Sequence, residues 1–203
     1  MKFKIGKTRL SISFSFLALI LLSCVWNDNR IFLISLIVSL FHELVHLAFI
    51  ITFGARLSEI RFSVAGGEIV RGNDVLTNGK EAIISLSAPI FNIISGGVLL
   101  LLNPESLLGA VSLVIGVFNL LPYDTFDGGR GMRFLLQGRL KNTTISIITA
   151  ILSFAVCFSF LAINALLIKN NSGNIFFLGM SLFLLILLVF RLFLKPKFQY
   201  GNL

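Results

Sequence analysis

Long runs of apolar residues alternate with short polar segments along most of the chain. Six of these runs approach the roughly 20 residues that a helix needs to cross the hydrocarbon core of a membrane. They occupy residues 10–26, 31–53, 82–102, 107–121, 145–168 and 175–194. The pattern therefore predicts an all-α polytopic membrane protein with six transmembrane helices.

The segment at residues 57–71, between the second and third apolar runs, has a different pattern. Apolar and polar residues alternate from residue 60 to residue 64, and the pair Gly66-Gly67 follows. Alternation with a period of two is typical of a strand, and a glycine pair suits a tight turn. We expect a short β-hairpin with a two-residue glycine turn; the alternative is an irregular loop whose apolar residues touch the membrane surface.

The composition agrees with a membrane protein. Hydrophobic residues make up 56% of the chain and charged residues only 13%, with a mean hydropathy of +0.96. A soluble domain carries about a quarter charged residues, so this chain could not cover its own surface in water. Disorder is excluded as well, because disordered segments are poor in apolar residues and rich in charge. Cys24 and Cys157 form no CxxC pair and are expected to be free thiols.

The basic residues predict the orientation in the membrane. With six spans, fifteen of the 17 lysines and arginines fall on one face, and only Arg30 and Lys169 fall on the other. Because basic residues accumulate in cytoplasmic loops, we expect both termini in the cytoplasm. This topology also explains the net charge of +8, so no nucleic-acid partner is expected. Residues 1–203 are predicted to form a single membrane domain, without internal repeats.

The candidate chemistry lies in the second run, where His42, Glu43 and His46 form an HExxH motif. Residues i and i+4 lie on one face of a helix, about 6 Å apart along its axis. Both imidazoles can therefore reach one zinc ion, and Glu43 can accept a proton from water beside it. The motif also arises by chance in soluble helices, but a carboxylate at bilayer depth is costly. The membrane setting thus favours a functional role over a structural one.

A catalytic zinc ion takes three protein ligands and leaves a fourth position for water. The chain has no third histidine and no well-placed cysteine, so the remaining ligand is expected to be a carboxylate. Asp124 and Asp127, after the fourth run, are both eligible, and their spacing does not choose between them. The pair Gly128-Gly129 would permit positive φ and a sharp turn beside the metal.

These motifs, taken in order, resemble the site-2 protease family of intramembrane zinc metalloproteases. The chain is similar to the six-span bacterial branch typified by the stage IV sporulation membrane protease. The matching segments are HExxH, Ala88-Pro89-Ile90-Phe91-Asn92, Asn119-x-x-Pro122 and Asp127-Gly128-Gly129. The family often has a proline and a leucine where this chain has Thr125 and Phe126. No cystathionine-synthase-type domain and no PDZ domain is expected.

The resemblance implies a role for each matching residue. It makes Asp127 the third ligand of one zinc ion beside His42 and His46, with Glu43 as the catalytic base. It implies that Asn119 holds the substrate or the oxyanion, and that Gly66 and Gly67 bind substrate. It also implies a multi-pass protein of a bacterial cell membrane. The partners would be a membrane-tethered substrate, such as a precursor or an anti-sigma type regulator, and a regulatory membrane protein.

We therefore expect hydrolysis of a peptide bond in or near a transmembrane segment, as in regulated intramembrane proteolysis. A membrane metal-ion transporter is one alternative, because intramembrane His and Asp can line an ion path. Transporters usually spread ionisable residues over several spans, whereas here they are concentrated at one point. A non-catalytic substrate-binding homologue is the other alternative, and the intact Glu43 argues against it.

Overall fold

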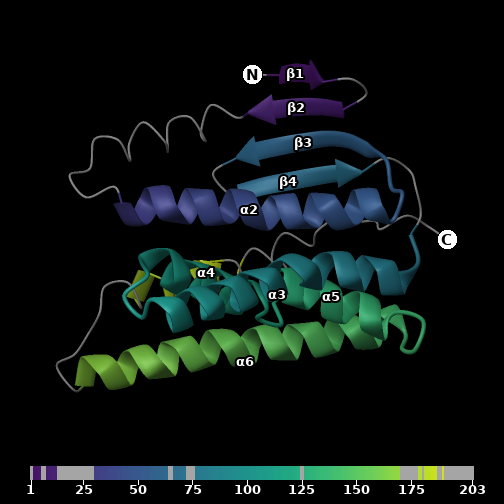
Figure 1. Ribbon diagram of the computed structural model, residues 1–203. Helices are drawn as coiled ribbons and strands as arrows, with labels where there is room; N and C mark the ends of the chain where they lie inside the picture. The colour runs from purple at the N-terminus through teal and green to yellow at the C-terminus, as the bar shows by residue number, and fades with distance from the viewer. Residues whose placement is uncertain are drawn as a thin grey trace.

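The computed structural model describes residues 2–5, 8–12, 30–63, 66–71, 76–123, 126–169, 178–179, 181–186 and 189. Within these ranges the fold is mainly helical, and a four-stranded sheet lies along one side of the helices (Figure 1). The helices are α2 (Arg30–Thr52), α3 (Asn78–Leu102), α4 (Leu107–Asn119), α5 (Asp127–Leu136) and α6 (Asn142–Lys169).

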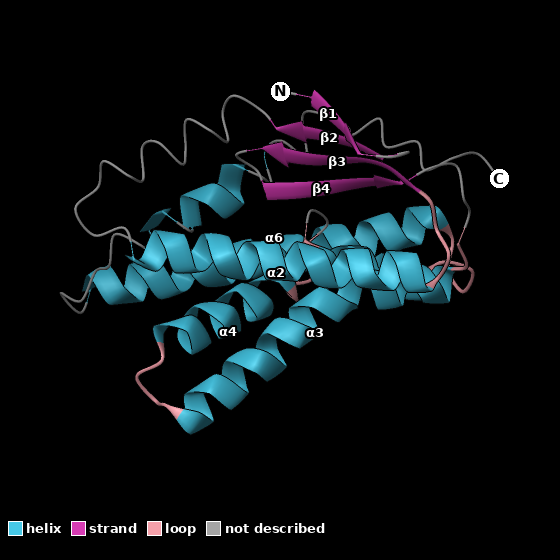
Figure 2. Ribbon diagram, turned by 45° about the horizontal axis from the view of Figure 1, so that its top comes forward, coloured by secondary structure: helices cyan, strands magenta, loops and turns pink. Residues whose placement is uncertain are grey.

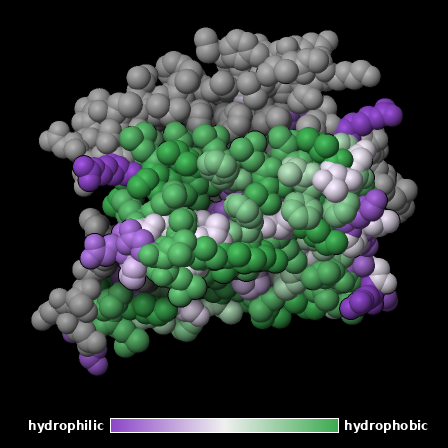
Figure 3. Space-filling view, in the orientation of Figure 1, coloured by the Kyte–Doolittle hydropathy of each residue, from purple (hydrophilic) through white to green (hydrophobic). Residues whose placement is uncertain are grey.

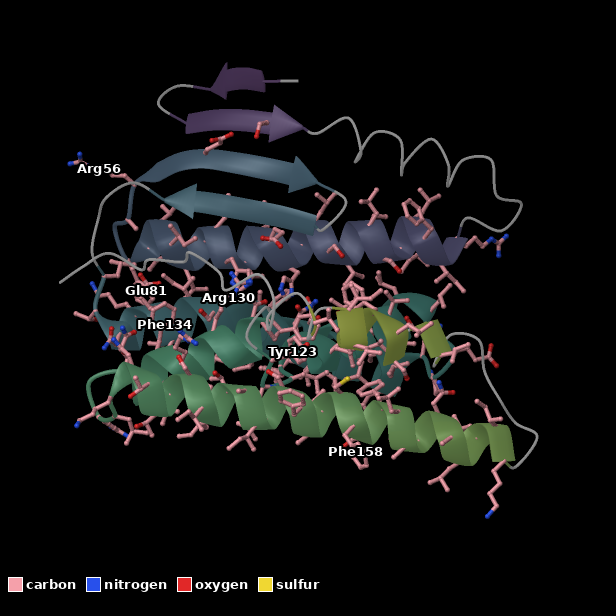
Figure 4. The ribbon with its side chains drawn as sticks, turned by 180° about the vertical axis from the view of Figure 1, so that it is seen from behind. Arg56, Glu81, Tyr123, Arg130, Phe134 and Phe158 are labelled. Carbon is pink, nitrogen blue, oxygen red and sulfur yellow. The ribbon has the colours of Figure 1, made fainter. Side chains whose placement is uncertain are left out.

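Three helices in the described part of the chain, α2, α3 and α6, are long and apolar enough to cross a membrane. Their bounds agree with the second, third and fifth apolar runs to within a few residues. Hydrophobic residues cover the middle of the face seen in Figure 3, and hydrophilic residues gather at its two ends. Phe158 of α6 is 73% exposed and points away from the other helices (Figure 4). Such a surface fits lipid rather than water.

The other three expected spans differ from these. Among the described helices, α4 is apolar but shorter than the three membrane-span candidates. It has 13 residues, so it spans only about 20 Å. It ends at Asn119 because Pro122 cannot continue a helix. The run at 10–26 begins inside a strand, and its residues 13–29 lie outside the described ranges. Of the run at 175–194, only residues 178–179, 181–186 and 189 are described, and all are helical.

The sheet corrects the expectation of an all-α fold. It consists of β1 (Lys2–Ile5), β2 (Thr8–Ile12), β3 (Leu57–Ser63) and β4 (Gly66–Arg71), in that order across the sheet. Strands β2 and β3 are parallel, and the other two pairs are antiparallel. The reason is local, because apolar and polar residues alternate in both N-terminal strands. The apolar run that follows them obscures this alternation in the sequence.

The expected two-residue glycine turn between β3 and β4 is also wrong. Gly66 and Gly67 lie inside β4, where they pair with Ser63 and Phe62 of β3. The connection is instead made by residues 64–65, which are not described. Glycine in a strand leaves one face of the sheet without a side chain, which allows another backbone to approach. Figure 2 shows β4 as the strand nearest to α2.

Helices α3 and α4 pack closely, because glycines bring their backbones together. A Cβ atom on Gly96 of α3 would lie 2.6 Å from the backbone nitrogen of Leu113 and 2.8 Å from the carbonyl oxygen of Gly109, both in α4. Small residues at such positions are typical of membrane helix pairs, which associate through close packing. This close contact fixes α4 against the helix that supports the site described below.

Replacing Gly96 with alanine is expected to lower the free energy of unfolding by about 1–3 kcal/mol, because the added methyl group meets backbone that cannot move away. The neighbouring Gly97 is a matched control, since a Cβ there meets nothing within 4 Å. Gly97→Ala should be neutral or stabilising by up to about 1 kcal/mol through helix propensity. Unfolding in increasing denaturing detergent, followed by circular dichroism, measures both. Equal stabilities would contradict the close α3–α4 contact.

Candidate metal centre

Helix α2 presents both histidines of the HExxH motif to the interior of the helices. His42 and His46 are buried, at 5% and 8% exposure, on the same stripe of α2 as Val38 and Ile50. One helical turn separates them, as the i, i+4 spacing predicts. Their rings meet edge to face with centroids 4.9 Å apart. The motif therefore forms one buried pair of imidazoles, as the sequence indicates.

Asp127 reaches the same point from α5, although it is 81 residues from His46 in the chain. Its Oδ2 atom lies 2.9 Å from His42 Nε2 and 3.1 Å from His46 Nε2. Asp127 is the first residue of α5 and is only 4% exposed. These three residues form the one group of metal-ligand side chains found among the described residues. Asp127 thus lies where the expected third ligand should lie. Asp124 is outside the described residues, so the choice between the two stays a prediction.

The glycines after Asp127 position it in a different way from the one expected. Gly128 and Gly129 are helical residues of the first turn of α5, so they do not form a sharp turn. A Cβ on Gly128 would overlap the carbonyl group of Leu120, just after α4. The absence of this side chain lets the start of α5 pack directly against the end of α4. The expected close backbone approach is present, without the positive φ.

A backbone contact sets the orientation of His46. Its Nδ1–H donates to the carbonyl oxygen of Ile84 in α3 at 2.8 Å. Pro89 lies inside α3 and has no N–H, so the carbonyl of Ser85, next to Ile84, receives no helix hydrogen bond from it. With the proton on Nδ1, a neutral imidazole has a lone pair on Nε2, which here faces Asp127. An unprotonated Nε2 and a carboxylate oxygen repel each other at this distance unless a metal ion or a proton lies between them.

His42 is held by a side chain of α3 that the sequence did not mark as a site residue. Asn92 is 1% exposed, and its amide nitrogen lies 3.2 Å from His42 Nδ1. The backbone carbonyl of Asn92 accepts a hydrogen bond from Ser112 of α4 at 3.0 Å, which ties this turn to α4. The amide nitrogen can only donate, so Nδ1 of His42 is the acceptor in this arrangement; with the Asn92 amide flipped, Nδ1–H would donate to its oxygen, as is common for a metal-bound histidine. The Ala-Pro-x-x-Asn resemblance was the sequence signal for this residue.

The donor set fits a zinc ion. Two imidazole nitrogens and one carboxylate oxygen are a catalytic zinc set, and ligands at about 2.0–2.1 Å from a tetrahedral ion lie roughly 3.3 Å apart. The observed distances of 2.9 and 3.1 Å are close to this spacing. Burial by itself raises the pKa of the Asp127 carboxyl, but its contacts with the imidazoles and Arg130 hold the pKa well below its ordinary range. Asp127 is therefore an anion.

Glu43 lies beside the ligands without belonging to them. It is half-buried on α2, next to His42, and it is near the charges of Asp127 and Arg130. The guanidinium of Arg130 itself lies 2.9 Å from the Oδ1 atom of Asp127. A carboxylate in this place can accept or donate a proton next to the metal position.

The remaining sequence-predicted residues are not brought into this cluster. Asn119 donates from its side-chain amide to the carbonyl oxygen of Ile115 in its own helix, at 3.0 Å. Gly66 and Gly67 lie in β4. Tyr123 was not predicted to matter, but it is fully buried and its hydroxyl donates to the carbonyl oxygen of Leu184 at 3.0 Å (Figure 4). This bond anchors the segment that leads to Asp127.

The fold and the site together define a membrane protein with a buried centre of metallohydrolase type. No protein-family model matches the chain. A curated zinc metalloprotease from Methanocaldococcus jannaschii is 30% identical over a 180-residue alignment, and the match covers 78% of this chain and 52% of that protein. The chain thus spans about half the length of that relative.

The solved structure of the site-2 protease from Methanocaldococcus jannaschii has the same fold, with a TM-score of 0.62. It is 25% identical to this chain, and the match covers 91% of each. Both comparisons support the site-2 protease family, in agreement with the resemblance that the motifs show.

Proposed function

We propose that this protein is an intramembrane zinc metalloprotease, which hydrolyses a peptide bond in or near a transmembrane segment of a membrane-tethered protein. The observation that carries the proposal is the convergence of His42 and His46 with Asp127, with Glu43 at their side. His42, His46 and Asp127 would hold the ion. When bound there, zinc supplies Lewis acidity, which activates water and polarises a carbonyl group.

Glu43 is the residue that moves the proton. It accepts a proton from the attacking water as the water oxygen forms a bond with the scissile carbonyl carbon. It then delivers that proton to the amide nitrogen as the carbon–nitrogen bond breaks, which leaves a carboxyl group and an amine. Asn119 would hold the substrate or the oxyanion. For this it must turn its amide away from Ile115, the partner it has here.

The substrate would bind at the sheet edge next to the metal centre. A transmembrane helix hides its peptide groups in internal hydrogen bonds, so it must unwind before it is cut. Strand β4 is at the edge of the sheet and contacts α2, which carries the two histidines (Figures 1 and 2). An unwound segment can pair with such an edge by strand addition. Gly66 and Gly67 would leave it room to approach.

We also propose a six-span topology with both chain ends in the cytoplasm. The charge asymmetry of fifteen to two among the 17 lysines and arginines supports it. Reporters fused after residues 71, 141 and 203 are expected to report the cytoplasm, and those after residues 29 and 171 the outside. A reversed result at any one position would mean that a span was miscounted.

The test of the function is a comparison of membrane proteomes from cells with the wild-type protein and with Glu43→Gln. A peptide released by the wild type alone identifies a substrate, such as a precursor or an anti-sigma type regulator, and addition of a zinc chelator should abolish its release. A photoreactive residue at Gly67 in the Glu43→Gln protein should capture that substrate. Zinc uptake into vesicles without any cleavage would instead indicate a transporter.

A further inference from the structure

The two oxygens of the Asp127 carboxylate have different environments. Oδ2 faces both imidazoles, at 2.9 Å from His42 Nε2 and 3.1 Å from His46 Nε2. Oδ1 is 2.9 Å from the Nη2 atom of Arg130, three residues further along α5. One oxygen therefore belongs to the candidate metal site, and the other is held by a guanidinium.

Arg130 is placed to fix the direction of this carboxylate. Residues i and i+3 are neighbours on a helix surface, so the side chain of Arg130 lies directly over that of Asp127. In Figure 4 its guanidinium is seen between the ribbons of α2 and α5. The Arg130 side chain is 51% exposed, whereas that of Asp127 is 5% exposed. An ion pair so open to water contributes little to folding, but a charge-assisted bond to a buried carboxylate restricts its rotation.

The number of carboxylate oxygens that bind matters for the chemistry. A carboxylate can bind a metal through one oxygen or through both. A catalytic zinc ion needs three protein donors and an open fourth position for water. If Oδ1 were free to turn inward, it would compete for that position.

We propose that Arg130 is a positioning residue, which holds Oδ1 of Asp127 away from the metal and so keeps Asp127 a one-oxygen ligand. The expected effect of Arg130 on cleavage rests on the proposed function. Its effect on the coordination of the metal can be measured independently. Partners of ligating residues typically affect metal affinity or activity by about 10–100-fold.

The experiment uses purified full-length protein in detergent, with Co²⁺ in place of Zn²⁺. The variants are Arg130→Gln, Arg130→Lys and the matched control Arg139→Gln, which removes an exposed arginine just beyond the end of α5. Four-coordinate Co²⁺ absorbs visible light much more strongly than five-coordinate Co²⁺. The wild type and Arg139→Gln should give the strong spectrum, Arg130→Gln the weak one, and Arg130→Lys an intermediate one.

Cleavage of the substrate by the zinc-loaded proteins supplies the second measurement. Arg130→Gln should lower kcat about 10–100-fold with KM within twofold of the wild type, and Arg130→Lys should recover part of the loss. A Co²⁺ spectrum for Arg130→Gln identical to that of Arg139→Gln would overturn the proposal. A rise in KM alone would do the same, because Arg130 would then contact substrate.

Two further outcomes are also decisive. If Arg130→Gln fails to fold, Arg130→Lys decides. An Arg130→Lys protein with the wild-type spectrum and kcat would overturn the proposal that the guanidinium positions Asp127. An intermediate spectrum would support it. If the wild type cleaves nothing, the proposed function fails. The spectra then still decide whether Arg130 positions Asp127.

Discussion

Replacing Glu43 with glutamine is expected to abolish peptide-bond cleavage while the metal remains bound. Glutamine keeps the size of the side chain and its hydrogen-bonding capacity but cannot accept the proton of the attacking water. A general base of this kind contributes about 10²–10⁴-fold to the rate. The loss should appear in kcat, and zinc content should stay close to that of the wild type, because Glu43 is not among the three converging ligands.

A matched control separates this effect from the loss of any buried carboxylate. Glu81 of α3 is 8% exposed, and it lies outside the group of metal-ligand side chains. Glu81→Gln should therefore keep cleavage within a few-fold of the wild type. Cleavage rate, zinc content and helicity are measured on both variants. A Glu43→Gln protein that is folded, binds zinc and still turns over at a near-normal rate would remove Glu43 from the mechanism.

The half of the site that lies on α2 could be predicted because its geometry is local. The helical repeat alone places residues 42 and 46 on one face, and the apolar run that contains them predicts the helix. No packing information is needed for that step. The two buried imidazoles, with ring centroids 4.9 Å apart, are its direct result.

The supporting residues could not be predicted in the same way. Asn92 meets His42 across 50 residues of sequence, and the contact depends on how α3 packs against α2. Ile84 contacts His46 through its backbone carbonyl, so its side chain gives no signal of the contact, which depends on how α3 packs against α2. In the sequence, Arg130 is one of fifteen basic residues that are expected on the cytoplasmic side. Only the position of Asp127 shows that it is part of the site.

The two N-terminal strands of the sheet were missed for a different physical reason. Strands β1 and β2 are only four and five residues long, and an apolar run begins inside β2. A hydropathy window as long as a membrane span averages over such short alternation. The parallel pairing of β2 with β3 joins residues that are about 50 positions apart, such as Arg9 and Glu59. Local sequence patterns contain no information on a pairing of that kind.

The second large effect is expected from the third ligand, Asp127. Asp127→Asn should weaken zinc binding by more than about 100-fold. Changing a residue that only contacts a metal ligand usually has a smaller effect, of about 10–100-fold. An amide is neutral and is a poor ligand for Zn²⁺, so both the charge and the donor are lost at the point where two imidazole nitrogens converge. Cleavage should fall with it, and added zinc should restore only part of it. Chelator competition measures the affinity.

Asp124→Asn is the matched control, because it makes the same chemical change three residues upstream in the same segment. It should leave zinc affinity and cleavage nearly normal. Asp127 also anchors Arg130, so Asp127→Asn changes two contacts, whereas Arg130→Gln changes only the second. A larger loss of zinc in Asp127→Asn than in Arg130→Gln would separate ligation from positioning. Zinc lost from Asp124→Asn but retained by Asp127→Asn would instead show that Asp124 is the ligand. The packing of Gly128 against Leu120 would then serve only to join α5 to the end of α4.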